Sequence, residues 1–261
     1  MNRYLSAVGL YARWNLYKIL AIILVTALAA GALVYRVPVG DVPVDMGLDP
    51  ETGETMQAFA YYDRLDGVIA GSRAPIVCAA GFAAIVAVMS LTGCGYGVKT
   101  EYTVRRLRVR ERRAVLSWAA YHAALLVVYW AVLAAVLYGV MCLRLQMDVP
   151  VDYFVYTYGP QSILLLYYTD TFLHHLLPLR DVAAWGVGIA SVLAAALSTV
   201  LFSYRQRRGS FSVMVLLALA GTIGSFFCGL GENANALLMV LLLGVAGAAF
   251  VMLIGGDKDA A

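Results

Sequence analysis

The sequence ALLMVLLLGVAGAAFVMLI, residues 236–254, contains no charged side chain and no proline. A helix that crosses the hydrocarbon core of a bilayer needs roughly 20 consecutive apolar residues, and this segment meets that requirement. The pattern predicts an all-α membrane protein with six transmembrane helices in one domain, residues 19–254. The other five segments lie at about residues 19–35, 76–96, 115–143, 182–202 and 211–228.

The composition of the 261-residue chain agrees with a multi-pass membrane protein. Apolar residues make up 62% of it and charged residues 13%, and its mean hydropathy is +0.79, whereas a soluble domain has about 25% charged residues. The first apolar segment is too long for a signal-peptide core and is followed by no clear cleavage pattern, so we expect it to stay attached. The four cysteines lie in or beside apolar segments without a CxxC pair, which indicates packing residues and neither a disulfide framework nor a metal site.

The basic segment VKTEYTVRRLRVRERR, residues 98–113, indicates the orientation. It has seven Lys and Arg residues and lies between the second and third apolar segments. With both termini inside, the cytoplasmic parts hold fourteen basic and four acidic residues, and the external parts hold five basic and twelve acidic residues. Because basic residues are retained on the cytoplasmic side, the sequence predicts an N-in, C-in topology. The cytoplasmic parts are residues 1–18, 97–114, 203–210 and 255–261, and the main external loops are residues 36–75 and 144–181.

Three segments outside the spans have patterns of their own. Residues 1–18 combine an apolar and aromatic stripe with Arg3, Arg13 and Lys18, which predicts an amphipathic elbow helix in the membrane plane; a frayed basic terminus is the alternative. Residues 162–179 are apolar but interrupted by polar positions, and we expect an external interfacial helix and not a seventh span. Residues 36–75 begin as an extended stretch and have a possible short helix around residues 56–66.

Catalytic patterns are weak in this sequence. GCGYGVKT, residues 93–100, differs from a phosphate-binding loop because Val98, not glycine, precedes Lys99. The G-x-S-x-G and HExxH patterns are absent, and the lone serines of the apolar segments are typical of side chains that bond to a backbone carbonyl. We therefore predict no catalytic residue and no bound metal in this chain.

The elbow, the six spans with both ends inside and the basic connection after the second span together resemble the permease subunits of type-2 ATP-binding cassette (ABC) exporters. YTVRRLRVRERRAVLSWAAYHAALLVVYW, residues 102–130, is similar to the cytoplasmic loop and third span of small bacterial permeases of this kind. The resemblance implies a coupling helix at residues 102–113 that docks on a separate ATPase subunit. The residues that would make this contact are Tyr102, Arg105, Arg106, Arg108, Arg110, Arg112 and Arg113.

The resemblance also implies partners and a location. The partners are a cytoplasmic ABC ATPase, which carries the ATP and Mg, and a second copy of the permease or a sibling permease. The location is the cytoplasmic membrane of a bacterium, with no cofactor in this chain and no nucleic-acid partner. A different reading of residues 102–113 is a solvated run that only sets topology and binds anionic membrane lipid.

The predicted function is therefore non-enzymatic export of an amphiphilic or peptide-like substrate. The alternative is a six-span channel, assembly factor or scaffold without an ATPase. In the best-known permeases of this family the large external elements lie between the fifth and sixth spans, whereas here that link is only residues 229–235. No substrate-binding residue is carried over for this reason.

Overall fold

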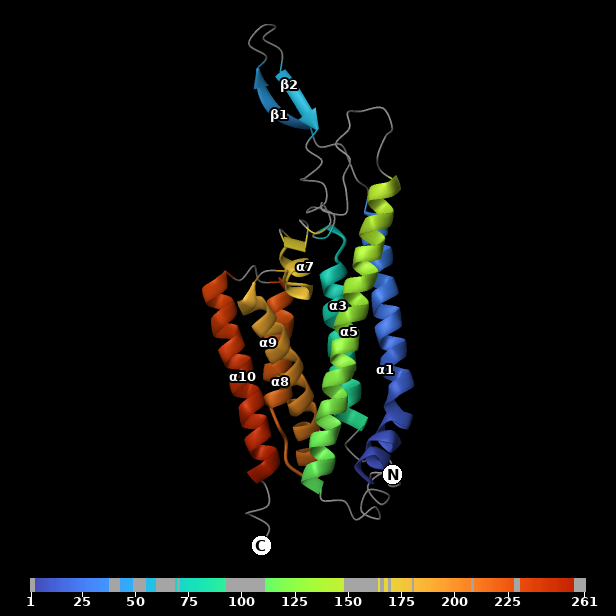
Figure 1. Cartoon of the computed structure of the whole chain (residues 1–261), viewed down its shortest axis with the longest axis vertical. Helices are drawn as coiled ribbons and strands as arrows, with labels where there is room; N and C mark the ends of the chain where they lie inside the picture. The colour runs from blue at the N-terminus through green and yellow to red at the C-terminus, as the bar shows by residue number, and fades with distance from the viewer. Residues whose placement is uncertain are drawn as a thin grey trace.

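The structure is a computed structural model. It describes residues 3–37, 43–48, 55–59, 69, 71–92, 111–147, 164, 167–168, 170–179, 181–207, 209–227 and 231–255. They form an elongated bundle of helices with a two-stranded hairpin beyond one end (Figure 1). In chain order the elements are α1 (Arg3–Arg36), β1 (Pro43–Leu48), β2 (Thr55–Phe59), α3 (Ala74–Thr92), α5 (Glu111–Met147), α7 (Thr171–Leu176), α8 (Val182–Gln206), α9 (Met214–Phe227) and α10 (Glu232–Gly255).

The two ends of the bundle differ in which helix termini they hold. We call the end where α1 and α5 begin and where α8 and α10 finish the basal end (Figure 1). The opposite end, where α8 and α10 begin, is the distal end. The short helix α7 and the hairpin lie at the distal end.

Five helices of the described residues are long and apolar enough to cross a membrane. They are Asn15–Arg36, Ala74–Thr92, Ala114–Leu143, Val182–Gln206 and Asn233–Gly255. The prediction of a helical multi-pass membrane protein is thereby confirmed, and five of the six expected spans have a matching helix.

The sixth expected span, residues 211–228, coincides with a shorter helix. α9 has 14 residues, which corresponds to about 21 Å at 1.5 Å per residue, whereas the hydrocarbon core is about 30 Å thick. Gly209, with a φ of 74°, follows the end of α8, and residues 210–212 are not helical. The structure therefore establishes five long apolar helices and one short one.

The elbow helix expected at residues 1–18 is not confirmed as a separate element. α1 is one helix of 34 residues from Arg3 to Arg36. Arg13 and Lys18 are exposed near its basal end, in the turns that precede or begin the apolar part.

The segments at the distal end are short. Within residues 162–179, the described helical residues are 164, 167–168 and the six residues of α7; α7 extends about 9 Å and by itself is too short to be a seventh span. The helix suggested around residues 56–66 is wrong over residues 56–59, which belong to β2. β2 pairs antiparallel with β1, and β1 has one extra residue between Asp45 and Leu48, as in a β-bulge.

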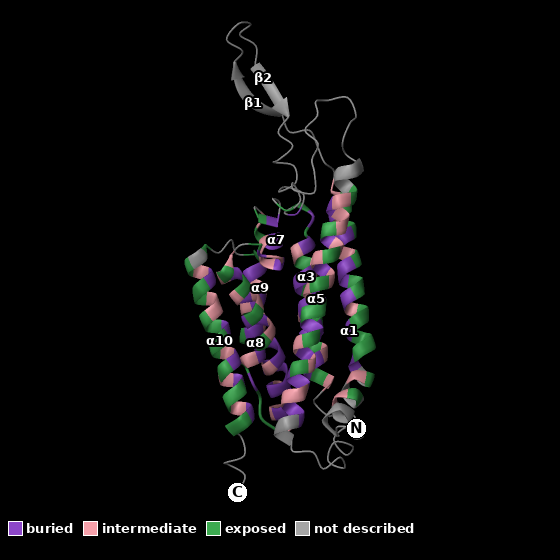
Figure 2. Cartoon of the chain, in the orientation of Figure 1, coloured by how far each residue is buried: buried purple, intermediate pink, exposed green. Residues whose placement is uncertain are grey.

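The exposure of apolar side chains agrees with a lipid environment. α10 buries one narrow seam, Leu242, Ala246, Ala249 and Leu253, mainly against α8. On its other faces apolar side chains are open, with Leu237 63% and Val251 67% exposed (Figure 2). An exposed surface of this kind would be unfavourable in water but is expected where acyl chains cover it.

The main core joins α1, α3 and α5. On α1 the buried side chains recur every three or four residues, as expected for one helix face, and they include Ile19, Ile23, Ala30 and Val34. Smaller clusters join α5, α8 and α10 near the basal end and α8, α9 and α10 further along.

Candidate functional site: an apolar groove between α5 and α8

The residues predicted to contact an ATPase are largely outside the part of the chain that the structure describes. Tyr102, Arg105, Arg106, Arg108 and Arg110 fall in the gap between residues 92 and 111. The remaining two positions, 112 and 113, lie in the first turn of α5 at the basal end.

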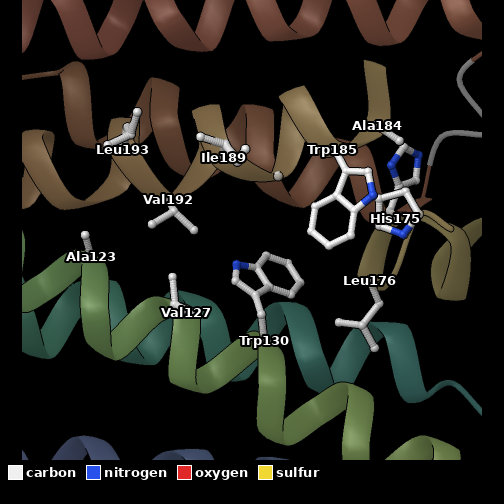
Figure 3. Close-up of a pocket in the computed structure, with 12 residues that line it drawn as sticks. Ala123, Val127, Trp130, His175, Leu176, Ala184, Trp185, Ile189, Val192 and Leu193 are labelled. Atoms are coloured by element: carbon white, nitrogen blue, oxygen red, sulfur yellow. The ribbon is translucent and has the colours of Figure 1, made fainter. Parts of the chain in front are cut away.

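The described side chains of α5, α7 and α8 line a groove between α5 and α8. It has a volume of about 370 Å³, within the range of small-molecule sites. Its walls are almost entirely apolar, and α7 closes its distal end (Figure 3). The lining residues are Ala123, Val127 and Trp130 of α5, His175 and Leu176 of α7, Pro178 just after α7, and Ala184, Trp185, Gly188, Ile189, Val192 and Leu193 of α8.

The groove exists because small residues lie where the two helices face each other. A Cβ atom placed on Gly188 would meet no atom within 4 Å. Ala123 and Ala184 add little more side-chain volume on the two opposite walls, while the rings of Trp130 and Trp185 project into the space between the helices (Figure 3). The small residues therefore leave the space that the two indoles narrow.

A buried polar contact holds α5 and α8 together on the basal side of the groove. His122 Nδ1 lies 3.0 Å from Thr199 Oγ1, and both side chains are buried. His122 directly precedes Ala123 of the groove wall. The contact therefore fixes the separation of the two helices at this end.

One polar atom of the groove lacks a partner among the described residues. Trp130 Nε1 is buried and makes no hydrogen bond with them. An N–H group left in this state costs about 1–3 kcal/mol, and water is scarce at membrane depth. The indole N–H is therefore a donor that has no acceptor in the described part of the chain.

Two aspartates hold α7 in place at the distal end of the groove. The sequence did not indicate that they act together. Asp170 is the N-cap of α7, and its Oδ1 accepts a hydrogen bond of 2.8 Å from Leu173 N. Asp181 is the N-cap of α8, and its Oδ1 accepts from Ala183 N at 2.8 Å and Ala184 N at 3.1 Å. Such caps satisfy backbone donors that a helix start leaves unpaired.

The second oxygen of Asp181 joins three helices. Oδ2 lies 3.5 Å from His174 Nε2 of α7 and 3.5 Å from Asn235 Nδ2 of α10. Burial raises the pKa of the Asp181 carboxyl, but hydrogen bonds from the Ala184 and Ala183 N–H groups and the contact with His174 outweigh this, so the pKa lies below its ordinary value. The carboxylate thus stays charged and positions α7 over the groove.

Three buried serine hydroxyl groups elsewhere in the bundle bond to the backbone, as expected for lone serines in spans. Ser198 donates to Ala195 O, Ser225 donates to Thr222 O, and Ser203 Oγ lies 2.7 Å from Ser90 O. Among the described side chains, no three His, Cys, Asp or Glu residues are grouped in a way that would hold a metal ion.

Sequence reasoning assigned no substrate-binding residue and did not find the groove. A sequence signal was present in the spacing of Ala184 and Gly188, which are one turn apart on one face of α8. That signal alone does not identify α5 as the opposite wall.

Comparison of the chain with protein-family models, with curated proteins and with solved structures finds no match. The fold itself defines the class: a multi-pass helical membrane protein, with a lateral apolar groove between two of its spanning helices.

Proposed function

We propose that this chain is the transmembrane permease subunit of an ABC exporter, which moves an amphiphilic or peptide-like substrate with ATP hydrolysed by a separate subunit. The observation that carries the proposal is the continuity of α5. This helix runs without interruption from Glu111, which lies within the basic segment 102–113, to Met147. Its middle part forms one wall of the groove.

A rigid helix of this length can transmit a displacement. At 1.5 Å per residue its 37 residues extend about 55 Å. A partner that pushed on residues 102–113 would move the basal end of α5, and the wall formed by Ala123, Val127 and Trp130 would move with it. In this proposal the basic residues form charge-assisted hydrogen bonds with carboxylates of the ATPase.

The course of the chain is compatible with six passages and two cytoplasmic ends. α1, α5 and α9 run from the basal to the distal end, and α3, α8 and α10 run back (Figure 1). In the proposal the non-helical residues 210–212 and α9 together make the fifth passage, and the first turns of α1 take the place of the elbow. The basal end, where Arg13, Lys18, Arg205 and Arg207 lie, is then cytoplasmic.

A permease of this type works as a pair. We propose that a second copy or a sibling permease completes the transporter in the cytoplasmic membrane of a bacterium. The wide apolar surfaces of α1 and α10 leave room for such a neighbour as well as for lipid.

The experiment that tests the proposal is co-purification with an ABC ATPase encoded beside this chain. Reversal of Arg105, Arg106 and Arg108 to glutamate should abolish recovery of the ATPase, because the carboxylates of the two proteins would repel each other. The matched control reverses three other basal cations, Arg13, Lys18 and Arg205, and should retain the ATPase. Membrane insertion of both variants is checked by alkaline extraction.

The alternative function is a six-span channel, assembly factor or scaffold that needs no ATPase. It predicts that both triple variants behave alike and that the unmodified protein purifies without an ATPase. Equal recovery of the ATPase with both variants would remove the coupling role from residues 102–113.

A further inference from the structure

We propose that the groove between α5 and α8 binds the acyl chain of a membrane amphiphile, with the carbonyl oxygen of its ester or amide linkage accepting a hydrogen bond from Trp130 Nε1. This inference deepens the proposed function by naming a substrate class. It rests on that function only for the transport step, because binding is tested without an ATPase.

The position of the groove makes an acyl chain the matching occupant. Its walls belong to the spans Ala114–Leu143 and Val182–Gln206, so it opens to hydrocarbon and not to water. From Ala184 to Leu193 the groove follows nine residue steps of α8, or about 13 Å. One leaflet contributes about 15 Å of hydrocarbon, so the groove matches the depth of a single leaflet at the distal side.

The narrowness of the groove favours a thin chain over a helix from a neighbouring protein. Its walls include the small residues Ala123, Ala184 and Gly188, and the indoles of Trp130 and Trp185 project into the space between them (Figure 3). Packed helices stay 8–10 Å apart because of their own side chains. A linear hydrocarbon chain has no such side chains and can lie between the two helices beside the indoles.

The polar groups of the site lie between the middle of the groove, at Trp130, and its distal end, at His175 (Figure 3). Trp130 Nε1 is the buried donor without a partner in the described part of the chain, and His175 of α7 lies at the distal end beside Trp185 (Figure 3). An amphiphile has the same asymmetry, since its linkage and headgroup lie at one end of an apolar chain. The chain would therefore enter between the helices with its headgroup directed toward α7.

The test uses Trp130 as the only tryptophan, after Trp14, Trp118 and Trp185 are replaced by phenylalanine. The protein is placed in nanodiscs of unbrominated phosphatidylcholine and titrated with lysophosphatidylcholine that has a brominated acyl chain, because bromine quenches indole fluorescence on contact. Binding predicts quenching that saturates at a low mole fraction of the probe. Quenching that only rises in proportion to the mole fraction would overturn the proposal.

Two variants link the signal to the groove. Gly188→Leu fills part of the groove without meeting the backbone, because the position faces open space, and it should abolish the saturable phase. Gly244→Leu on α10 also faces open space but lies outside the groove, and it should leave that phase unchanged. If Gly188→Leu instead preserves the saturable phase and reduces cross-linking between two copies, the groove is a helix interface and the acyl-chain site is wrong.

The role of Trp130 is tested by the linkage of the probe. An ether-linked lysolipid lacks the carbonyl oxygen and should bind about fivefold to tenfold more weakly than the ester-linked form. Equal affinities would show that the indole does not recognise the linkage. All variants are first compared by circular dichroism and gel filtration to verify that they fold. A second measurement uses protein that keeps all four tryptophans: the amount of probe that stays bound after affinity purification is determined. Its result does not depend on the three phenylalanine substitutions.

Discussion

His122 of α5 and Thr199 of α8 form a hydrogen bond whose direction is set by a third group. Thr199 Oγ1 donates its single hydrogen to Ala196 O at 2.9 Å. The hydroxyl must therefore accept from His122 Nδ1 across the 3.0 Å contact. His122 is in consequence the tautomer with hydrogen on Nδ1, and Nε2 is an acceptor without a partner in the described part of the bundle.

This direction predicts the effect of removing the hydroxyl group. Thr199→Val preserves the side-chain shape but leaves the His122 N–H without its acceptor. We expect a loss of about 0.6 to 1.7 kcal/mol in unfolding free energy, the range measured for hydrogen bonds between membrane helices. Thr199→Ser keeps the hydroxyl and is the control. Thermal unfolding in detergent measures the difference, and equal stability of the two variants would show that the bond contributes nothing.

A second prediction concerns the close approach of α1 and α3. A Cβ atom on Gly81 would overlap the Thr26 side chain, including its Cβ at 2.9 Å. Because overpacking of a filled interior costs about 1–3 kcal/mol, Gly81→Ala should lower the unfolding free energy by that amount. Thr26→Ala removes the two outer contacts and should restore part of the loss in the double variant.

Two other glycines provide graded controls. At Gly221 an added Cβ meets Leu242 Cδ2 at 2.9 Å, the far end of a flexible side chain, and at Gly188 it meets nothing. The expected order of destabilisation is therefore Gly81→Ala, then Gly221→Ala, then Gly188→Ala. The opposite order in thermal unfolding would contradict the helix packing described above.

The long apolar helices could be predicted because nearly every residue of a span must be apolar, a constraint that is visible in a single segment. The residues at which these helices end could not be predicted as accurately. The fourth span was predicted to finish at residue 202, but α8 continues to Gln206, because Tyr204 remains buried against Trp118 and α10 and the positive φ of Gly209 comes only later. The fifth span was overestimated because hydropathy does not distinguish the non-helical residues 211 and 212 from helix.

The groove could not be predicted for a different reason. It depends on how α5 and α8 cross, and Ala123 and Gly188 are far apart in the sequence. The predicted coupling residues have a sequence signal, the basic run, but most of them lie outside the described residues and remain a prediction.

Asp181 predicts a dependence of stability on pH. Asp181→Ala removes the cap from Ala183 N and Ala184 N and should cost about 0.5–2 kcal/mol at neutral pH, whereas Asp181→Asn keeps an acceptor and should cost less. Because the folded-state pKa lies below its ordinary value, the contribution of the carboxylate is fully present above the unfolded-state pKa of about 3.9. It is lost as the pH falls through the lower, folded-state pKa.

The difference between the unmodified protein and Asp181→Ala should therefore shrink when the pH is lowered from about 7 to about 3. Chemical denaturation in detergent at the two pH values measures it. A difference that grows at the lower pH would mean that the folded protein favours the protonated form of Asp181, against the geometry of its hydrogen bonds.

The last prediction concerns the side of the membrane on which each end lies. Thr171 of α7 is exposed at the distal end, and Ser210 is exposed just after α8 at the basal end. In a protein from which all four cysteines have been removed, Thr171→Cys should react with a membrane-impermeant maleimide in intact cells. Ser210→Cys should react only after permeabilisation, because the basic residues near the basal end favour the cytoplasmic side. If only Ser210→Cys is labelled in intact cells, the predicted topology is inverted, and residues 102–113 lie on the side of the membrane opposite to the ATPase. If both variants are labelled in intact cells, α8 does not cross the membrane.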